Sequence, residues 1–427
     1  MKIAPMNAGG ADPTAPIVVI GAGQAGFSVC VKLREFGHSG PITLVGDEPQ
    51  PPYQRPPLSK AYLLGEMAPE TLHFRPPAFF ERKSIDLRLA TRAERIDRPS
   101  QEVVLSDGAT LPYARLVLAT GARPRRLPAT LCRDLAGIYH VRTLADIDAM
   151  AAEFRPARHV LVVGGGYIGL EAAAVAAKLG LRVTVVEAAP RILQRVAAAE
   201  TSEFFRTLHR AHGVDLREGT GLVALTGTDR VKRALLTDGS EISVDFVVAG
   251  IGVRPNVGLA EAAGLTMCNG IVVDAHCRTS DPRILAAGDC ASFPWRGERI
   301  RLESVGNAIG QAEAAARTIV GKPEAYDARP WFWSDQFDVK LQIAGLSSGY
   351  DHVVKRKGSG ASASFWYYRG LALLAVDAMN EPRAYMVARR LIDTGRSPSP
   401  ALVGDPAADL KSLLDGEDAQ SGRAAGD

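Results

Sequence analysis

The sequence has 427 residues, 46% of them hydrophobic and 23% charged, and this length suggests about three domains. No apolar run approaches the roughly 18 residues of a membrane-spanning helix, and a net charge of +3 is too small to indicate nucleic-acid binding. Five cysteines without a CxxC or CxxxxC pair suggest reduced thiols. Residues 1–16 have the pattern of neither a signal nor a transit peptide, so we expect a cytoplasmic protein.

The first informative segment predicts a dinucleotide-binding strand, turn and helix. An apolar run at 17–20 leads into the loop Gly21–Gly26 (GAGQAG), and the next apolar run, 42–45, ends close to two acids. Glycines let the backbone approach a pyrophosphate at a helix N-terminus, and an acid after the second strand can accept hydrogen bonds from ribose hydroxyls. The candidate ligands here are Gly21, Gly23, Gln24, Ala25, Gly26, Asp47 and Glu48.

The same pattern recurs in the middle of the chain. Residues 160–163 lead into Gly164–Gly169 (GGGYIG), and a later apolar run ends at Glu187. A carboxylate there repels a 2′-phosphate and favours NADH over NADPH, although two nearby arginines, Arg191 and Arg195, leave the preference open. FAD is then the dinucleotide expected at the first site. The candidate NAD ligands are Gly164, Gly166, Tyr167, Ile168, Gly169, Glu187, Arg195 and Gly252.

Three later segments extend the first site. A strand at 116–120 ends in small residues where the chain can leave one domain, and 246–256 is the expected return crossing. An apolar strand then closes on Asp289, a costly position for an acid unless a group such as a ribityl hydroxyl binds it. A helix predicted from Val305 to Ile319 would direct free backbone amides to the flavin.

The remaining chain predicts an α+β module, with a hairpin over 365–376 and a helix over 382–394. We expect His209 and His212 to face solvent without binding a metal, and Cys290 to be a small buried hydrophobe. The predicted domains are FAD-binding segments at 12–119 and 250–326, an NADH-binding domain at 120–249, a C-terminal α+β domain at 327–410 and a disordered tail at 411–427.

These residues resemble the FAD-dependent ferredoxin reductases of the putidaredoxin-reductase type, which serve bacterial oxygenase systems. The resemblance spans about residues 15–395, and its most specific segments are 51–60 (PPYQRPPLSK) and 333–336 (WSDQ). The first of these reads YQRPPLSK where relatives often have YDRPPLSK. Further segments that carry it are Gly21–Gly26, 46–48, 120–124, 164–171, Gly288-Asp289, 303–305 and 341–343.

The resemblance implies an α/β, glutathione-reductase-like fold: two Rossmann-type dinucleotide-binding domains followed by the α+β domain. It implies FAD and NADH as cofactors and a 2Fe-2S ferredoxin as acceptor, which supplies a haem-thiolate monooxygenase or a ring-hydroxylating dioxygenase. Residues 51–60 contain no cysteine, so electrons are expected to leave the flavin without a thiol relay. The flavin contacts that it adds are Arg55, Lys60, Ala93, Thr120, Gly121, Arg142, Asp289 and Val305.

The resemblance also implies three catalytic residues. Lys60 would lie beside the flavin and pair with Glu171, and Trp333 would line the nicotinamide and flavin cavity. The alternatives are a surface lysine, a helix glutamate and a core tryptophan, and Arg142 can equally be a bridging salt-bridge residue. Three basic clusters could steer an acidic ferredoxin: 123–126, 296–301 and 355–357.

Rival functions are reduction of rubredoxin or monodehydroascorbate and an apoptosis-inducing-factor-like response to NADH. We predict no nucleic-acid or membrane partner and a monomer or weak dimer.

Overall fold

A computed structural model describes residues 12–360 and 362–414. The described chain divides into two compact units. Of the described residues, unit 1 contains 12–54, 69–123 and 254–328, and unit 2 contains 55–68, 124–253, 329–360 and 362–414. No helix within these ranges is long and apolar enough to cross a membrane.

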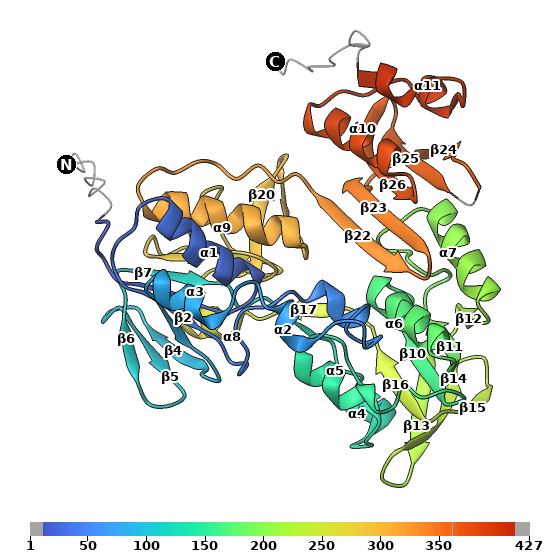
Figure 1. Ribbon diagram of the computed structural model, residues 1–427, viewed down its shortest axis with the longest axis horizontal. Helices are drawn as coiled ribbons and strands as arrows, with labels where there is room; N and C mark the ends of the chain where they lie inside the picture. Colours follow the sequence, from blue (N-terminus) through green and yellow to red (C-terminus); the bar gives the residue numbers. More distant parts are fainter. Residues whose placement is uncertain (1–11, 361, 415–427) are drawn as a thin grey trace. The chain divides into compact units, whose positions relative to one another are not determined.

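Unit 1 is built on a five-stranded parallel sheet in the order β19-β7-β1-β2-β3. Strands β2 and β7 of this sheet are labelled in Figure 1. Its central strand, β1, is buried along its whole length, as expected for a parallel sheet covered on both faces. The strands are β1 Ile17–Ile20, β2 Ile42–Val45, β3 Ile85–Arg88, β7 Arg115–Leu118 and β19 Ile284–Ala286.

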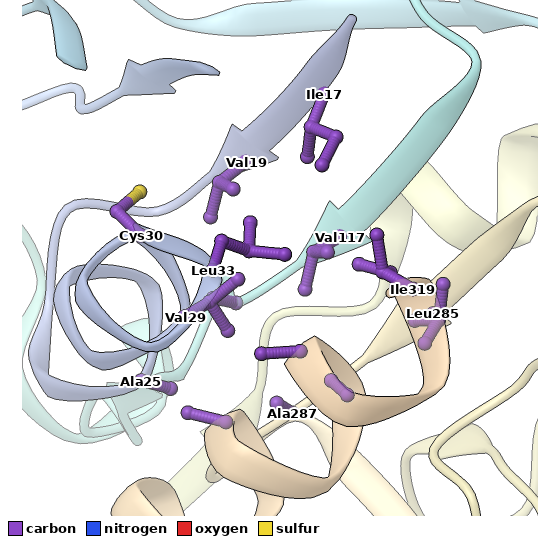
Figure 2. Close-up of a cluster of buried hydrophobic side chains, with 14 of the residues drawn as sticks. Ile17, Val19, Ala25, Val29, Cys30, Leu33, Val117, Leu285, Ala287 and Ile319 are labelled. Atoms are coloured by element: carbon purple, nitrogen blue, oxygen red, sulfur yellow. The ribbon is translucent and has the colours of Figure 1, made fainter. Parts of the chain in front are cut away.

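Two helices, α1 (Gln24–Glu35) and α9 (Val305–Ile319), pack together on one face of this sheet. Figure 2 shows the shared core, in which Val29 and Leu33 of α1 lie near Val19 of β1. Alternate strand residues such as Val18 belong to a second core on the opposite face. Each fully buried side chain of this kind contributes about 1.5–3 kcal/mol, so the sheet is firmly held between its two cores.

Unit 1 also contains short elements around this sheet. One antiparallel sheet is formed by β4 Ala93–Asp97, β5 Glu102–Leu105 and β6 Thr110–Pro112, and another small sheet by β18 Ile271–Val272, β20 Ala291–Trp295 and β21 Glu298–Ile300. The short helices are α2 Pro69–Leu72, α3 Pro77–Arg82 and α8 Gly258–Ala262. The chain passes between the units within β8 Ala122–Pro124 and β17 Val253–Pro255, and also after residues 54, 68 and 328.

Unit 2 contains a second five-stranded parallel sheet, β12-β11-β10-β16-β9, in which β10, β11, β12 and β16 pair as β1, β2, β3 and β7 do in unit 1. Helix α6 (Tyr167–Lys178) follows the central strand β10, as α1 follows β1. The two expected Rossmann-type folds are therefore confirmed. The strands are β9 Ile138–Tyr139, β10 His159–Val163, β11 Arg182–Glu187, β12 Asp215–Glu218 and β16 Phe246–Ala249.

Further elements of unit 2 surround this second sheet. They are the antiparallel strands β13 Leu222–Gly227, β14 Val231–Leu236 and β15 Glu241–Ser243, the helices α4 Ala129–Cys132, α5 Leu144–Ala151 and α7 Ala199–Ala211, and the 3-10 helix η1 Pro56–Ser59.

The C-terminal part of unit 2 is the predicted α+β module. Its antiparallel sheet has the order β22-β23-β26-β25-β24, and β25 and β26 form the predicted hairpin. The strands are β22 Trp331–Gln336, β23 Val339–Gly345, β24 His352–Lys357, β25 Ala363–Arg369 and β26 Ala372–Met379. The helices are α10 Pro382–Asp393, α11 Pro400–Gly404 and the 3-10 helix η2 Leu410–Leu414.

The prediction of a disordered tail from residue 411 is wrong for its first four residues. Residues 411–414 belong to η2, where Leu410 and Leu413 are buried in the same core as α10. Apolar side chains spaced three apart on one short helix explain this order. The rest of the predicted tail, 415–427, lies outside the described residues.

A buried carboxyl group connects the C-terminal sheet to α7. Asp377 of β26 is 1% exposed and accepts hydrogen bonds from Tyr367 of β25 and, at 2.7 Å, from Thr201 Oγ1 of α7. The backbone amide of Ala198 also donates to the Tyr367 hydroxyl at 3.0 Å. Burial raises the pKa of Asp377 to about 6, although these hydrogen bonds favour the ionised form.

This pKa predicts how the stability of unit 2 depends on pH. Because the folded state binds the Asp377 proton more tightly than the unfolded state, the contribution of this group is complete below about pH 4 and is lost as the pH rises through about 6. As the pH rises from about 4 to about 7, we expect the free energy of unfolding of Asp377→Asn to increase by about 3 kcal/mol relative to that of the unsubstituted protein.

Urea unfolding at several pH values, followed by tryptophan fluorescence, measures this difference. Asp338→Asn, at an exposed position in the β22–β23 turn, is the control. A difference for Asp377→Asn that is constant across this pH range would contradict the prediction.

Candidate active site

The first glycine loop has two glycines that the fold requires and one that it does not. Gly21 has a φ of +110°, and a Cβ there would lie 2.1 Å from the carbonyl oxygen of Ala119. A Cβ on Gly26 would lie 1.9 Å from the carbonyl oxygen of Gly21. At Gly23, by contrast, no atom of the described residues comes within 4 Å of the Cβ position. Packing therefore explains Gly21 and Gly26, whereas Gly23 leaves free space at the N-terminus of α1.

That N-terminus offers backbone donors to a ligand. Gly23 is the N-cap residue of α1, and no side chain caps the helix. By comparison, α9 is capped by Ser304, whose hydroxyl accepts from the Asn307 amide at 3.2 Å. Uncapped amides combined with the free space at Gly23 fit a pyrophosphate, so this loop fits the adenine dinucleotide FAD.

The other predicted FAD residues of unit 1 gather at the same end of its sheet. Parallel strands β1, β2, β7 and β19 all end there, so the residues that follow them share one edge. Glu48, after β2, accepts a hydrogen bond from the Tyr53 hydroxyl at 2.5 Å, and Asp47 is exposed. Thr91, two residues before Ala93, donates its amide to Gly46 at 2.9 Å.

The two crossing segments are joined at this edge. Thr120 Oγ1 donates to the carbonyl oxygen of Asn256 at 2.6 Å, and Asn256 Nδ2 donates back to that of Thr120 at 2.8 Å. The Asn256 amide also donates to the Gly121 carbonyl at 2.9 Å. Asp289 follows β19 here, next to Cys290, whose thiol is buried and has a pKa raised by that burial. Cys290 is thus the buried small residue that we expected.

The second glycine loop repeats the first in detail. Gly164 has a φ of +107°, and its Cβ would lie 2.5 Å from the carbonyl oxygen of Gly250. A Cβ on Gly169 would lie 2.1 Å from the carbonyl oxygen of Gly164. By contrast, none of the described residues has an atom within 4 Å of a Cβ on Gly166. Gly166 is the N-cap of α6, again without a side-chain cap. This loop fits a second dinucleotide.

Glu187 ends β11 beside this second loop. Its carboxylate accepts hydrogen bonds from the amides of Gly165 at 2.7 Å and Ala189 at 2.8 Å. Both oxygens keep a further lone pair for ribose hydroxyls. Arg191 points elsewhere, because its guanidinium donates to Ser202 Oγ at 2.6 Å. Arg195 lies near Gly252, with Nη2 3.4 Å from the Cβ position of that glycine.

Lys60 and Glu171 meet within unit 2, as the resemblance implied. Lys60 Nζ lies 2.8 Å from Glu171 Oε2, and the two side chains are 16% and 1% exposed. The hydroxyls of Ser59 and Ser334 donate to Glu171 at 2.5 and 2.7 Å. Burial raises the pKa of Glu171, and the lysine and the two hydroxyls oppose that rise. Because all three groups donate, the geometry matches an ionised carboxylate.

Other predicted residues of unit 2 lie apart from this pair. Trp333 stacks on Trp331, with ring centroids 5.5 Å apart, and it is adjacent in β22 to Ser334, so their side chains point to opposite faces of the strand. The structure therefore does not bring Trp333 to Glu171. Arg55 Nη1 donates to the carbonyl oxygen of Arg142 at 2.7 Å, so these two predicted flavin contacts are neighbours.

The expectation that His209 faces solvent is wrong. His209 is fully buried, and its Nε2 lies 2.8 Å from Gln336 Oε1 of β22. The C-terminal sheet supplies this contact, which a helical pattern alone does not reveal. His212 is exposed, as expected, and its ring stacks on that of Phe337 with the ring centroids 3.8 Å apart.

Our sequence reasoning also missed Ser59, Ser334 and Gln336 as partners of the Lys60–Glu171 region. The spacing of Ser334 and Gln336 in the WSDQ segment was an available signal, because residues two apart in a strand share a face.

Comparison with known proteins agrees with this geometry. Residues 15–314 match the family model described as pyridine nucleotide-disulphide oxidoreductase, and residues 331–414 match a model described as reductase C-terminal. The chain belongs to the pyridine nucleotide-disulphide oxidoreductase family. This oxidoreductase therefore has the glutathione-reductase-like fold expected from its sequence, and the expected cofactors, FAD and a nicotinamide dinucleotide, are confirmed at the level of the family.

Several relatives resemble this oxidoreductase along nearly their whole length. Rhodocoxin reductase of Rhodococcus erythropolis is 44% identical over 399 residues, which cover 92% of this chain and 93% of the relative. Putidaredoxin reductase CamA of Pseudomonas putida is 42% identical over 407 residues, covering 93% and 96%. A crystal structure of the covalent putidaredoxin reductase–putidaredoxin complex matches with a TM-score of 0.91 at 41% identity, covering 94% of this chain and 98% of that chain. The resemblance inferred from the motifs is confirmed.

The two free glycine positions allow a direct test of both dinucleotide sites. A methyl group at Gly23 or Gly166 would contact none of the described residues, so Gly23→Ala and Gly166→Ala should fold normally. We expect Gly23→Ala to lose FAD during purification, and Gly166→Ala to keep FAD while its KM for NADH rises at least about tenfold. Flavin absorbance per protein and steady-state kinetics measure the two effects.

Gly258→Ala, at an equally uncrowded glycine in α8, is the matched control. Normal FAD content in Gly23→Ala together with normal NADH kinetics in Gly166→Ala would contradict the assignment.

Proposed function

We propose that this protein is an NADH-dependent reductase that passes electrons through FAD to a 2Fe-2S ferredoxin, which supplies an oxygenase. The observation that carries the proposal is the pair of glycine cradles, joined in one chain with a buried Lys60–Glu171 ion pair. Several relatives bear names of this class, among them a ferredoxin–NAD(+) reductase component of an anthranilate 1,2-dioxygenase system. A cytoplasmic location and a monomer or weak dimer stay predictions from the sequence.

The division of chemistry between cofactor and protein follows from these sites. When bound, FAD accepts a hydride from NADH and releases electrons one at a time. The amides at the α1 and α6 N-termini bind the two pyrophosphates. Glu171 holds Lys60 by a 2.8 Å ion pair, so a fixed positive charge is available to stabilise negative charge that develops on the flavin.

Our preference for NADH rests on Glu187 and on the position of Arg191. The Glu187 carboxylate is held at the end of β11 by two backbone amides, where it repels a 2′-phosphate. Arg191, which the sequence left as a possible phosphate ligand, donates to Ser202 Oγ instead. Arg195 is then the cation beside this loop that could still moderate the preference.

The route out of the flavin is argued from the cysteines. All five are free: Cys30, Cys132, Cys277 and Cys290 are buried and Cys268 is exposed. Burial raises the pKa of the four buried thiols, which disfavours the reactive thiolate. Because the chain contains no CxxxxC pair, direct transfer from the flavin to an external one-electron acceptor is the route that we propose.

All three predicted basic clusters contain arginines that are already engaged; in the first, Arg123 donates to Asn256 Oδ1 at 2.9 Å. Arg301 forms an ion pair with Glu303 at 2.7 Å, and the Arg356 guanidinium donates to four backbone carbonyls, including that of Asp405 at 2.7 Å. Arg126, Lys355 and Lys357 are exposed. These exposed cations are our candidates for steering an acidic ferredoxin.

A panel of acceptors tests the proposed function. We expect fast NADH-dependent reduction of a 2Fe-2S ferredoxin, slower reduction of rubredoxin, and little reduction of monodehydroascorbate. Rubredoxin is the second candidate because a rubredoxin-NAD(+) reductase is also among the relatives. Raising the salt concentration from about 0.01 to 0.5 M should slow ferredoxin reduction several-fold and leave ferricyanide reduction nearly unchanged. A faster rate with rubredoxin, or an equal response to salt for both acceptors, would overturn the proposal.

Substitution of Lys60 tests its catalytic assignment. We expect Lys60→Ala to slow anaerobic flavin reduction by NADH at least about tenfold, because the positive charge is lost where negative charge develops. Stopped-flow absorbance at the flavin band measures the rate, and FAD content checks that the protein is loaded. Lys232→Ala, at an exposed lysine of β14, is the control. An unchanged reduction rate in fully loaded Lys60→Ala would exclude the assignment.

A further inference from the structure

The hydrogen bonds around Glu171 continue into the protein through three more side chains. Ser334 Oγ donates to Glu171 Oε1 at 2.7 Å, and Gln336 Nε2 donates to Ser334 Oγ at 3.1 Å. His209 Nε2 lies 2.8 Å from Gln336 Oε1. Each of these three side chains is fully buried. A continuous buried chain therefore runs from α7 through β22 to Glu171 on α6.

Three elements of unit 2 place these groups in line. Ser334 and Gln336 are two residues apart in β22 and share one face of the strand. The Ser334 hydroxyl contacts Glu171 of α6, and the Gln336 amide contacts His209 of α7. The strand thus bridges two helices, α6 and α7, that follow the neighbouring strands β10 and β11 of the parallel sheet of unit 2.

The direction of each hydrogen bond follows from the group at the Glu171 end. An ionised carboxylate only accepts, so the Ser334 hydroxyl must donate to it and accept from the Gln336 NH2 group. Gln336 then presents its carbonyl oxygen to His209, whose Nε2 must carry a proton. Every donor in the chain points toward Glu171, and hydrogen bonds aligned in this way strengthen one another.

The surroundings of His209 agree with this direction. Burial lowers the pKa of His209 to about 4, so the ring is neutral near pH 7 and carries a single proton. The other ring nitrogen, Nδ1, is buried and has no hydrogen-bond partner among the described residues. The tautomer with its proton on Nε2 therefore donates to Gln336 and leaves Nδ1 unprotonated, so every hydrogen bond in the chain has a donor.

We propose that His209, acting through Gln336 and Ser334, is a positioning residue that keeps Glu171 ionised and in the orientation that holds Lys60. The effect on flavin reduction rests on the function proposed above, in which Lys60 acts on the flavin. The effect on Glu171 itself does not depend on that function. Lys60 and Ser59 both donate to Oε2, so the Ser334 arm is the one that holds Oε1.

Substitutions of His209 and Gln336 separate this role from simple packing. Gln336→Leu removes both links, and His209→Leu removes the terminal donor, so we expect about tenfold slower flavin reduction with a KM for NADH within about twofold. His209→Gln retains an N–H donor toward Gln336 and should restore most of the rate. His212→Leu, at the exposed C-cap histidine of α7 that stacks on Phe337, is the matched control and should leave the rate unchanged.

Infrared spectroscopy provides a readout that does not involve turnover. The carboxylate band lost on Glu171→Gln identifies Glu171, and we expect that band to shift toward that of a protonated acid in Gln336→Leu and His209→Leu but not in His209→Gln. If Gln336→Leu does not fold, His209→Leu carries the test. An unchanged Glu171 band in both variants, or a His209→Gln variant as slow as His209→Leu, would overturn the proposal.

The two proposals fail in distinguishable ways. A shifted Glu171 band with normal flavin reduction would support the hydrogen-bonded chain and contradict the role of Lys60. A slow Lys60→Ala enzyme with an unshifted Glu171 band in Gln336→Leu and His209→Leu would support the role of Lys60 and contradict the hydrogen-bonded chain.

Discussion

A carboxylate that is 1% exposed must be given its partners by the fold, and Glu171 of α6 is such a group. Removing one partner of a buried ion pair typically costs 3–5 kcal/mol, because the remaining charge stays buried. The three partners here come from two segments: Lys60 and Ser59 from the segment around η1, and Ser334 from the C-terminal sheet. The buried Glu171 carboxylate therefore links separate segments of unit 2, because its ion pair and hydrogen bonds come from both of them.

Helix α6 joins this charge to nucleotide binding. Its N-terminus, left uncapped at Gly166, is the cradle that we assign to the nicotinamide dinucleotide, and Glu171 lies little more than one turn further along. The helix also carries a run of alanines that are almost fully buried, which lets it lie close to its neighbours. One rigid element thus fixes both the dinucleotide phosphate site and the carboxylate that holds Lys60.

The sequence predicted the parts of this structure that depend on local pattern. The strand, glycine loop and helix of each dinucleotide fold occur where expected, because the loops require glycine. Gly21 and Gly164 have φ above +100°, and a Cβ on Gly26 or Gly169 would collide with the backbone. The pairing of Lys60 with Glu171 came from resemblance alone, since no periodicity connects residues so far apart. His209 could not be placed from the sequence, because its neighbour Gln336 comes from a sheet 127 residues later in the chain.

The buried face of the C-terminal module contributes the Ser334 hydroxyl, which contacts Glu171. The neighbouring Trp333 stacks on Trp331, and its role at the nicotinamide and flavin cavity stays a prediction. A second buried carboxyl, Asp377, connects the same sheet to Thr201 of α7. The module thus reaches the second Rossmann-type fold through two buried acids, one on each side of the interface within unit 2. Polar contacts of this kind specify one register, because any shift would leave a buried charge unpaired. This explains why the C-terminal sheet is folded together with the second Rossmann-type fold in unit 2.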